Sequence, residues 1–259
     1  MTTLSYKNQS VHIDAGELVS FQVDAQEYIH QKGSPGWRNA DTEMFPIIGP
    51  TADANFRVET PKGTAVQDQH GLLREMNYQK VSGTTTEAIF EKTYKAGTLI
   101  KNSKYPEKST EEFLHWPYDF TFRKIITLSE EGLEVRFVIS GVSGMPYMLG
   151  YHPAFNLVTA NPTLHSGTQE ISLEDVLAVG SRALQVAKCK EITLKDKNTI
   201  HIKTEGFGNF MLWTEVKNMV CIEPITFYPY AVKQEHLAEG FSILGAEDAI
   251  YKMTISVSN

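Results

Sequence analysis

The sequence predicts an all-β protein whose strands form a large antiparallel β-sandwich. In several short segments apolar residues fall on every second position, which is the period of a strand with one buried face. These segments are separated by Gly, Asn, Asp or Pro, the residues that favour turns. No segment shows the apolar spacing of a helix long enough to cross over a parallel sheet. The length fits one large β-domain, and we expect a single domain over residues 1–259.

The strand-like segments follow one another along the chain. Val19-Ser20-Phe21-Gln22-Val23 alternates near the N-terminus, and residues 251–257 alternate near the C-terminus. The clearest hairpin joins residues 122–128 to residues 133–139 through Ser129-Glu130-Glu131-Gly132, a turn whose Gly can supply a positive φ. Further strands are expected at residues 86–92, 191–194, 199–203 and 210–216.

Helices and long loops are expected to be few. Residues 172–179 and 234–239 each have room for one or two helical turns. Residues 97–112, in which Lys, Ser, Asn and Pro are scattered, are expected to form a long exposed loop. This loop is not expected to be a domain boundary, because strand-like segments lie on both sides of it.

Composition and charge exclude several classes of function. The chain is 41% hydrophobic and 21% charged, as in soluble globular proteins, and its net charge of -7 leaves no basic face for nucleic acid. The first residues lack the pattern of a signal peptide, and no apolar run approaches the roughly 20 residues of a membrane span. We therefore expect a cytoplasmic protein that binds neither nucleic acid nor membranes. Cys189 and Cys221 are expected to be reduced and buried, and neither belongs to a zinc-binding pattern.

Three motifs carry the candidate functional side chains: Gln69-His70-Gly71-Leu72-Leu73-Arg74, Gly150-Tyr151-His152-Pro153-Ala154-Phe155-Asn156 and Cys221-Ile222-Glu223-Pro224. His152 is flanked by a Gly, which permits close backbone approach, and by a Pro, which ends strand pairing. Glu223 lies in an apolar stretch, where burial is expected to raise the pKa of its carboxyl. The alternatives stay open: Glu223 as a buried Glu satisfied by Arg or amides, His70 in a simple turn, and Arg74 as a surface cation. The other histidines that look structural are His12, His30, His165, His201 and His236.

The order of the motifs resembles that of the aldose 1-epimerase family, also called galactose mutarotases, and especially its shorter bacterial branch. The matching segments are Trp37 with Phe45-Pro46-Ile47-Ile48-Gly49, Asp68 to Arg74, Trp116-Pro117-Tyr118-Asp119-Phe120, Gly150 to Asn156, and Cys221 to Pro224. Each motif is weak alone, but five in this order make a fairly specific signal.

The resemblance implies a β-supersandwich with an open cleft, and an isomerase that needs no metal and no organic cofactor. In the family, the His at the position of His152 is the general acid and the Glu at the position of Glu223 is the general base. The base removes the proton of the C1 hydroxyl while the acid protonates the ring oxygen, so that the sugar ring opens, rotates and recloses as the other anomer. We expect these two groups to face each other across the sugar.

The resemblance also implies the groups that hold the substrate, a small-molecule sugar. His70 corresponds to a residue that holds the sugar and stabilises charge, and Arg74 to one that binds hydroxyls or, in one branch, a phosphate. Trp37 and Asn156 are the remaining implied substrate-binding residues. Trp213 and Phe155 are further aromatic candidates for stacking on the sugar. A monomer or homodimer is expected.

Two departures from the better-known galactose mutarotases leave the substrate open. Their sugar-binding Asp has no confident equivalent here, since Asp175 and Asp196 lie outside recognisable motifs, and the Gly-Gly-containing motif around the first His is absent. Arg74, with Arg38 or Lys62, could receive a hexose 6-phosphate, but the early segment is unlike the phosphosugar branch, so a free aldose ranks first. A non-catalytic sugar-binding or sensing module is the alternative from another class. A glycoside hydrolase ranks lower, because only one carboxylate lies in a motif.

Overall fold

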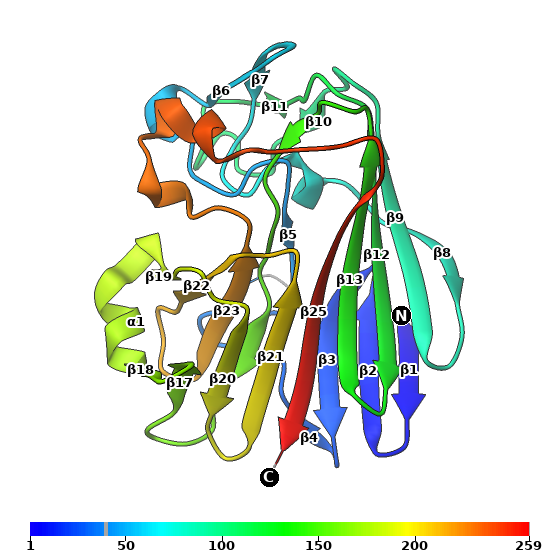
Figure 1. Cartoon of the computed structure of the whole chain (residues 1–259), viewed down its shortest axis with the longest axis vertical. Coiled ribbons are helices and arrows are strands. Elements are labelled where there is room, and N and C mark those ends of the chain that lie inside the picture. The colour runs from blue at the N-terminus through cyan, green and yellow to red at the C-terminus, as the bar shows by residue number, and fades with distance from the viewer. Residues whose placement is uncertain (39–40, 259) are drawn as a thin grey trace.

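The computed structural model describes residues 1–38 and 41–258, and its main elements are antiparallel strands, as the sequence predicts (Figure 1). The largest sheet has nine strands. In sheet order these are β18 (Gln169–Ser172), β17 (Thr163–Ser166), β20 (Glu191–Lys195), β21 (Thr199–Glu205), β25 (Ala249–Ser258), β13 (Gly132–Gly141), β12 (Phe120–Ser129), β9 (Glu87–Tyr94) and β8 (Gln79–Gly83).

Two further sheets lie behind the nine-stranded sheet in Figure 1. A six-stranded sheet contains β19 (Leu184–Val186), β22 (Asn209–Trp213), β23 (Met219–Ile225), β15 (Gly150–Tyr151) and β5 (Glu43–Met44), with β16 (Ala154–Asn156) also paired to β23. A four-stranded sheet contains β1 (Thr2–Tyr6), β2 (Gln9–Asp14), β3 (Glu17–Val23) and β4 (Gln26–Glu27).

The remaining elements are short. Three two-stranded ribbons pair β6 (Arg57–Thr60) with β7 (Gly63–Val66), β10 (Ile100–Lys101) with β11 (Phe113–Leu114), and β14 (Pro146–Tyr147) with β24 (Ser242–Ile243). One α-helix, α1 (Leu173–Val179), is accompanied by 3₁₀ helices at Ala52–Ala54, Leu72–Glu75, Gly180–Arg182, Pro229–Ala231 and Gln234–Gly240. Among the described residues, no helix is long and apolar enough to cross a membrane.

Aromatic side chains join the nine-stranded and six-stranded sheets into a sandwich. The ring of Phe137 on β13 packs edge-on against Tyr151 of β15, with centroids 5.0 Å apart. Phe45, which follows β5, lies 5.3 Å from the ring of Phe122 on β12. All four side chains are buried, so the inner faces of the two sheets share one apolar core.

Most of the predicted elements are confirmed. The central hairpin pairs β12 with β13 from Phe120 to Ser129, and Gly132 has the positive φ of 110° that the turn requires. Helix α1 begins where the sequence indicates, because the Ser172 hydroxyl accepts a hydrogen bond from the Asp175 amide in a capping box. The predicted strand over residues 210–216 is too long: the Thr214 hydroxyl bonds to the backbone of Val216, which forms a turn after Trp213.

The segment 97–112 is only partly the exposed loop that the sequence predicts. It contains strand β10 and two buried polar side chains, Asn102 and Ser109. The amide of Asn102 donates to the Ser109 hydroxyl, to the backbone of Glu111 and to the carboxylate of Asp68. This part of the chain is therefore tied to the segment that carries His70.

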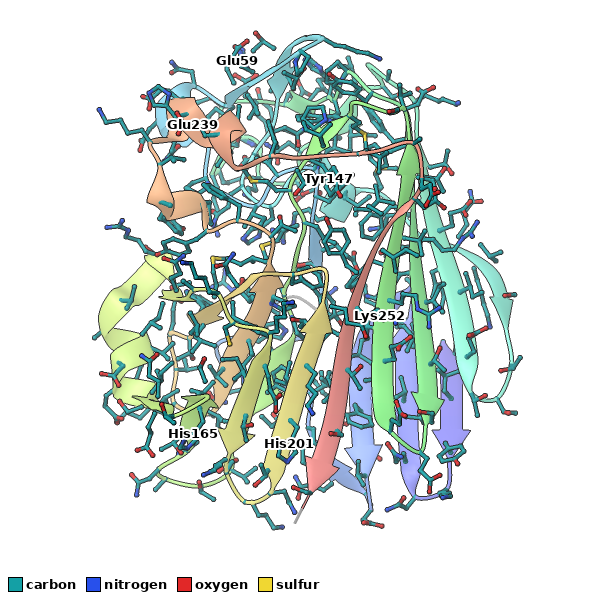
Figure 2. All side chains as sticks on the ribbon, in the orientation of Figure 1. Glu59, Tyr147, His165, His201, Glu239 and Lys252 are labelled. Atoms are coloured by element: carbon teal, nitrogen blue, oxygen red, sulfur yellow. The ribbon has the colours of Figure 1, made fainter. Side chains whose placement is uncertain are left out.

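The structural histidines behave as the sequence predicts. His165 and His201 lie at the lower end of the nine-stranded sheet in Figure 2, on β17 and β21. Each ring nitrogen Nε2 contacts a hydroxyl, that of Thr163 at 3.0 Å and that of Ser258 at 3.1 Å. Both cysteines are free and buried; Cys221 lies in β23, whereas Cys189 lies in the turn before β20.

Candidate functional site

A cavity of about 240 Å³ gathers five of the six predicted site residues: Trp37, His70, Arg74, His152 and Glu223. Its other lining residues are Thr42, Ile48, Gly49, Gln69, Ser181, Ala183, Met211, Trp213, Glu215, Pro229 and Tyr230. These come from distant parts of the chain that meet beside strands β5, β15, β22 and β23. The sequence motifs, which are far apart along the chain, thus form one concave site of the kind that binds small molecules.

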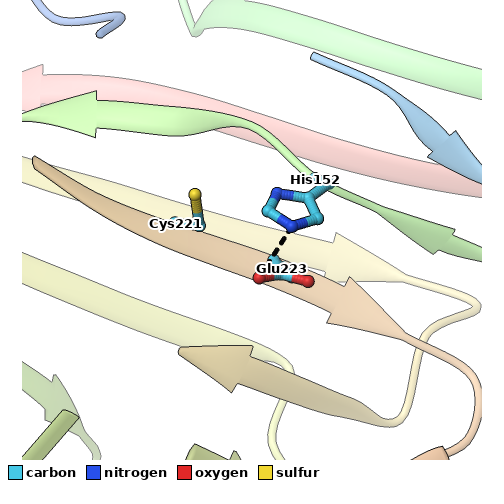
Figure 3. A group of neighbouring side chains, drawn as sticks. All are labelled: His152, Cys221 and Glu223. Atoms are coloured by element: carbon cyan, nitrogen blue, oxygen red, sulfur yellow. Dashed lines mark ion pairs between the residues drawn. The ribbon is translucent and has the colours of Figure 1, made fainter. Parts of the chain in front are cut away.

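His152 and Glu223 lie side by side in the wall of this cavity (Figure 3). His152 directly follows β15, and its amide donates to the carbonyl of Thr42 at 2.9 Å. Glu223 lies in the fully buried strand β23, opposite Met211 of β22. His152 Nε2 and Glu223 Oε1 are 3.4 Å apart, and the two residues are 8% and 1% exposed. The two groups contact each other, so they do not face each other across a substrate as the sequence analysis expects.

Burial dominates the electrostatics of the pair. It raises the pKa of the Glu223 carboxyl well above its usual value. Burial, assisted by the charge of Arg74, lowers the pKa of His152 to about 3. At neutral pH the imidazole is therefore neutral, and a proton held by the pair lies on the carboxyl. The prediction that the setting of Glu223 is apolar and raises its pKa is confirmed.

His70 is held by a tight backbone turn. Its φ of 76° lies in the left-handed region, and Gly71 follows with φ 71°. A Cβ on Gly71 would lie 2.2 Å from the carbonyl oxygen of Phe45, so only glycine fits there. The His70 amide donates to the carbonyl of Ile48 at 3.1 Å, which fixes the turn against the strand-end segment after β5.

Arg74 sets the tautomer of His70. It lies in the 3₁₀ helix Leu72–Glu75, and its Nη1 donates to His70 Nδ1 at 2.8 Å. Because a guanidinium can only donate, Nδ1 is the acceptor and Nε2 carries the ring proton. Burial, together with the charges of Arg74, His152 and Lys104, lowers the pKa of His70 well below its usual value. A neutral His70 whose ring also lies 5.4 Å from that of His152 can donate one hydrogen bond to a ligand.

The loop 97–112 supports this turn from outside the cavity. Lys104 Nζ donates to the Asp68 carboxylate at 2.7 Å and to the carbonyl of Gln69 at 3.0 Å. Burial opposes ionisation of Asp68, but Lys104 and Asn102 outweigh it and lower the pKa of that carboxyl. The segment that precedes His70 is therefore anchored by a partly buried ion pair.

Two tryptophan side chains lie beside His152 in the cavity. Trp37 lies 5.2 Å from the His152 ring and Trp213 lies 6.0 Å from it, centroid to centroid. Both line the cavity and offer flat apolar surface to a sugar ring. Phe155, the other aromatic candidate, is fully buried in the core and does not line the cavity.

The structure corrects the expectation for Asn156. Its Oδ1 accepts a hydrogen bond from His30 Nδ1 at 2.8 Å, and its Nδ2 donates to the carbonyls of Glu27 and Ile29. It does not line the cavity, because it lies in β16 and holds the segment around β4 instead. Arg38 and Lys62, the proposed helpers for a phosphate, are also absent from the cavity lining, and Lys62 lies over the ring of Tyr118.

Sequence reasoning missed several lining residues and one buried neighbour. Gln69 and Glu215 line the cavity, but the sequence analysis gives neither a function. Gln69 belongs to the first motif, whereas no sequence pattern connects Glu215 with the site. Cys221 lies two residues before Glu223 in β23, so both side chains project from the same face of the strand. His152, Cys221 and Glu223 each offer one donor atom within 4.8 Å of the others, a group that could hold a metal ion. The sequence analysis expects no zinc site because neither cysteine belongs to a zinc-binding pattern; His152 is brought to Cys221 and Glu223 only by the fold.

Comparisons with known proteins agree with the geometry. A family model described as aldose 1-epimerase matches residues 16–207. Protein LacX (plasmid) of Lactococcus lactis subsp. lactis is 26% identical over 166 residues, 60% of this chain and 50% of the relative. The chain thus aligns with about half the length of the curated relatives that it matches.

Solved structures show the same fold. A galactose mutarotase-like protein from Lactobacillus casei superposes with a TM-score of 0.80 at 18% identity, covering 99% of both chains. A galactose mutarotase related enzyme from Lactobacillus acidophilus gives a TM-score of 0.75 at 20% identity, covering 100% of this chain and 98% of the other. The predicted fold class, a galactose mutarotase-like β-sandwich, is confirmed.

Proposed function

The chain belongs to the aldose 1-epimerase family, and we propose that it interconverts the α and β anomers of a free aldohexose. The observation that carries the proposal is the contact between His152 and Glu223 at 3.4 Å in the wall of a cavity with aromatic sides. The ring oxygen and the C1 hydroxyl of a sugar are bonded to one carbon. A proton donor and a proton acceptor that lie side by side can therefore each reach one of these two oxygens.

Ring opening and closure need one proton shared by His152 and Glu223, and they consume no protons overall. One group donates to the ring oxygen while the other takes the proton of the C1 hydroxyl, which opens the ring to the aldehyde. After rotation about the C1–C2 bond, the two transfers run in reverse and close the ring on its other face. Each well-placed acid or base contributes on the order of 10²- to 10⁴-fold.

The family resemblance assigns His152 as the acid and Glu223 as the base. Burial favours Glu223 over His152 as the holder of the proton that the pair carries, since it raises the pKa of that carboxyl and lowers that of the imidazole to about 3. Transfer of this proton to His152 across the 3.4 Å contact generates the assigned arrangement. The pair carries one proton in both arrangements. The rate therefore depends on the presence of that one proton and not on which of the two groups holds it.

The pH dependence of the rate follows from this count. Activity should be lost as the pH rises through the raised pKa of Glu223, because the pair then has no acid. It should be lost on the acid side only as the pH falls toward the lowered pKa of His152, about 3, because the pair then has no base. We expect kcat/KM, corrected for the uncatalysed rate at each pH, to be flat from about pH 5 up to the raised pKa of Glu223. An acid-side inflection near the ordinary histidine pKa of about 6.5 would contradict the buried, neutral His152.

Arg74 and His70 are proposed to hold sugar hydroxyls. Arg74 is the only Lys or Arg among the described residues that line the cavity, and one of its nitrogens already donates to His70. A phosphate dianion is usually held by several cations and amides, so this lining favours an uncharged sugar over a hexose 6-phosphate.

Arg74→Ala is expected to raise KM for the preferred aldose roughly 10- to 100-fold, the usual cost of a lost hydrogen bond to a charged group. The turnover number should change less, because His152 and Glu223 remain. Initial rates measured by NMR of the anomeric protons, at several sugar concentrations, separate the two parameters. Arg136→Ala on β13, whose guanidinium pairs with Glu134, is the matched control. An unchanged KM in Arg74→Ala would remove Arg74 from the substrate site.

Polarimetry on freshly dissolved α-D-glucose, α-D-galactose and glucose 6-phosphate tests the function itself. We expect acceleration with at least one free aldose and less with the phosphate. Sugar binding without acceleration of any aldose would favour the non-catalytic module instead.

A further inference from the structure

Three metal-type donors of different chemistry meet beside the cavity, and two of them, His152 and Glu223, line it. His152, Cys221 and Glu223 are each at least nine-tenths buried, and one donor atom of each lies within 4.8 Å of the others. Figure 3 shows the thiol of Cys221 and the carboxyl of Glu223 on the same side of β23, with the His152 ring beside them. No role in the proposed epimerisation needs the thiol.

The separation between the imidazole and the carboxylate suits a shared ion. Zn²⁺ binds His nitrogen at about 2.0–2.1 Å and carboxylate oxygen at about 2.0–2.2 Å, so two such ligands in a tetrahedral site are about 3.4 Å apart. His152 Nε2 and Glu223 Oε1 are 3.4 Å apart, which is longer than a normal hydrogen bond between them. The pair is thus already spaced like one edge of a zinc tetrahedron.

The donor set also selects the class of metal. A thiolate and an imidazole favour Zn²⁺ and similar thiophilic ions, whereas Mg²⁺ and Ca²⁺ prefer oxygen ligands alone. Three protein ligands leave a fourth position for water or a sugar hydroxyl. His152 and Glu223 line the cavity, which gives an ion a path to the site.

We propose that His152, Cys221 and Glu223 form a binding site for Zn²⁺, and that the bound ion inhibits the enzyme. Binding releases the thiol proton of Cys221, and the carboxyl proton where present, to solvent. The ion then occupies the lone pairs that the acid and the base need. The inhibitory part rests on the proposed epimerase function; the binding part does not.

We expect Zn²⁺ to bind this site reversibly, because the second nitrogen of the His152 ring lacks a supporting hydrogen bond among the described residues. A metal-bound histidine usually donates its other ring N–H to an acceptor, which raises affinity. His152 Nδ1 is buried and has no hydrogen-bond partner within the described part of the chain. We therefore expect weaker binding than in closed structural zinc sites, and release by a chelator.

Cobalt binding tests the site without any activity measurement. Titration of the metal-free, reduced full chain with Co²⁺ should give one equivalent of bound ion with a thiolate-to-cobalt charge-transfer band, and Zn²⁺ should displace it. Cys221→Ser should lose the band and weaken Zn²⁺ binding, measured against a chromophoric chelator, roughly 100-fold. Cys189→Ser is the matched control, because Cys189 is the other free buried thiol and does not belong to the group of three donors.

A second variant guards against misfolding of Cys221→Ser. Glu223→Gln removes another ligand with almost no change in shape, and it should weaken Zn²⁺ binding while it keeps the thiolate band with Co²⁺. Absence of the band in the wild type, or the same band in Cys221→Ser, would overturn the site.

The inhibition is tested separately, with each protein compared to its own metal-free rate. Zn²⁺ should slow the wild type and the Cys189→Ser variant, and a chelator should restore both. Cys221→Ser should need roughly 100-fold more Zn²⁺ for the same fractional loss. Stoichiometric binding without loss of rate would overturn the inhibitory part alone, whereas a protein with no epimerase activity that still binds Co²⁺ would overturn only the proposed function.

Discussion

Glu223→Gln is expected to lower the rate of anomer interconversion by roughly 10²-fold or more. The amide can neither give nor take the proton that the His152–Glu223 pair exchanges with the sugar, so one partner of the transfer is removed. The shape of the side chain is kept, and the fully buried strand β23 should pair as before. His152→Asn should have an effect of similar size for the same reason.

The fold of this variant should be at least as stable as that of the wild type. The pKa of Glu223 is raised in the folded protein, so the carboxyl costs the fold stability as the pH rises above its unfolded value of about 4.3. Glutamine carries no such cost. Thermal unfolding at neutral pH, measured with the same samples as the kinetics, separates lost chemistry from lost structure.

Glu215→Gln provides the control for Glu223→Gln. Glu215 is a second carboxylate that lines the same cavity, but it is exposed to solvent. We expect the turnover number of the Glu215→Gln variant to differ from that of the wild type by less than roughly threefold, because Glu215 takes no proton from the sugar. A well-folded Glu223→Gln protein with a near-normal rate would exclude Glu223 from the chemistry.

The largest expected effect on stability concerns Lys124, whose ammonium is buried under the site. It lies on β12 with no exposed surface and forms ion pairs with Asp41 and, at 2.8 Å, with Glu43. The Tyr151 hydroxyl donates to Asp41 at 2.6 Å, which adds a further bond to the same carboxylate. Burial alone would lower the pKa of Lys124, but the two carboxylates raise it to about 12. The three charges therefore form one buried cluster.

Lys124→Met should lower the free energy of unfolding by about 3–5 kcal/mol, because it leaves two buried carboxylates without their cation. Urea unfolding followed by tryptophan fluorescence measures the change. The rate of anomer interconversion should fall as well. Asp41 and Glu43 flank Thr42, whose carbonyl accepts a hydrogen bond from the His152 amide, so a shift of these carboxylates would also displace His152.

Arg123→Met is the control from the same strand. Arg123 directly precedes Lys124 on β12 and lies on the opposite, solvent-facing side, where it pairs with Glu91 at 2.7 Å. An exposed pair of this kind contributes about 0–1 kcal/mol. If Lys124→Met cost no more than Arg123→Met, the buried cluster would not hold the sheets together.

Alternation of apolar residues predicted the strands well where one face is buried and the other is wet. The same rule contained a signal for Lys124 that the prediction did not use. The side chains of residues 122, 124, 126 and 128 all point into the core, so Lys124 stands at an inward position of an otherwise regular strand. A lysine there indicates buried carboxylates on the facing sheet, although the sequence cannot say which.

The errors in the candidate site have a different origin. Asn156 was expected near the sugar because it belongs to the same motif as His152, but nearness along the chain does not fix the direction of a side chain. Three residues separate the two, and strand β16, which ends at Asn156, carries that side chain to the contact with His30. The contact between His152 and Glu223 could not be foreseen either, because it depends on how β15 and β23 pair.

The cavity draws its walls from segments spread between Trp37 and Tyr230. No fragment of the chain contains a whole site, and long-range strand pairing of this kind forms slowly. Recovery of activity after dilution from denaturant would therefore measure only fully folded molecules, whereas circular dichroism would also detect partly assembled sheets. Comparison of the two signals would time the closing of the site against the formation of the strands that carry it.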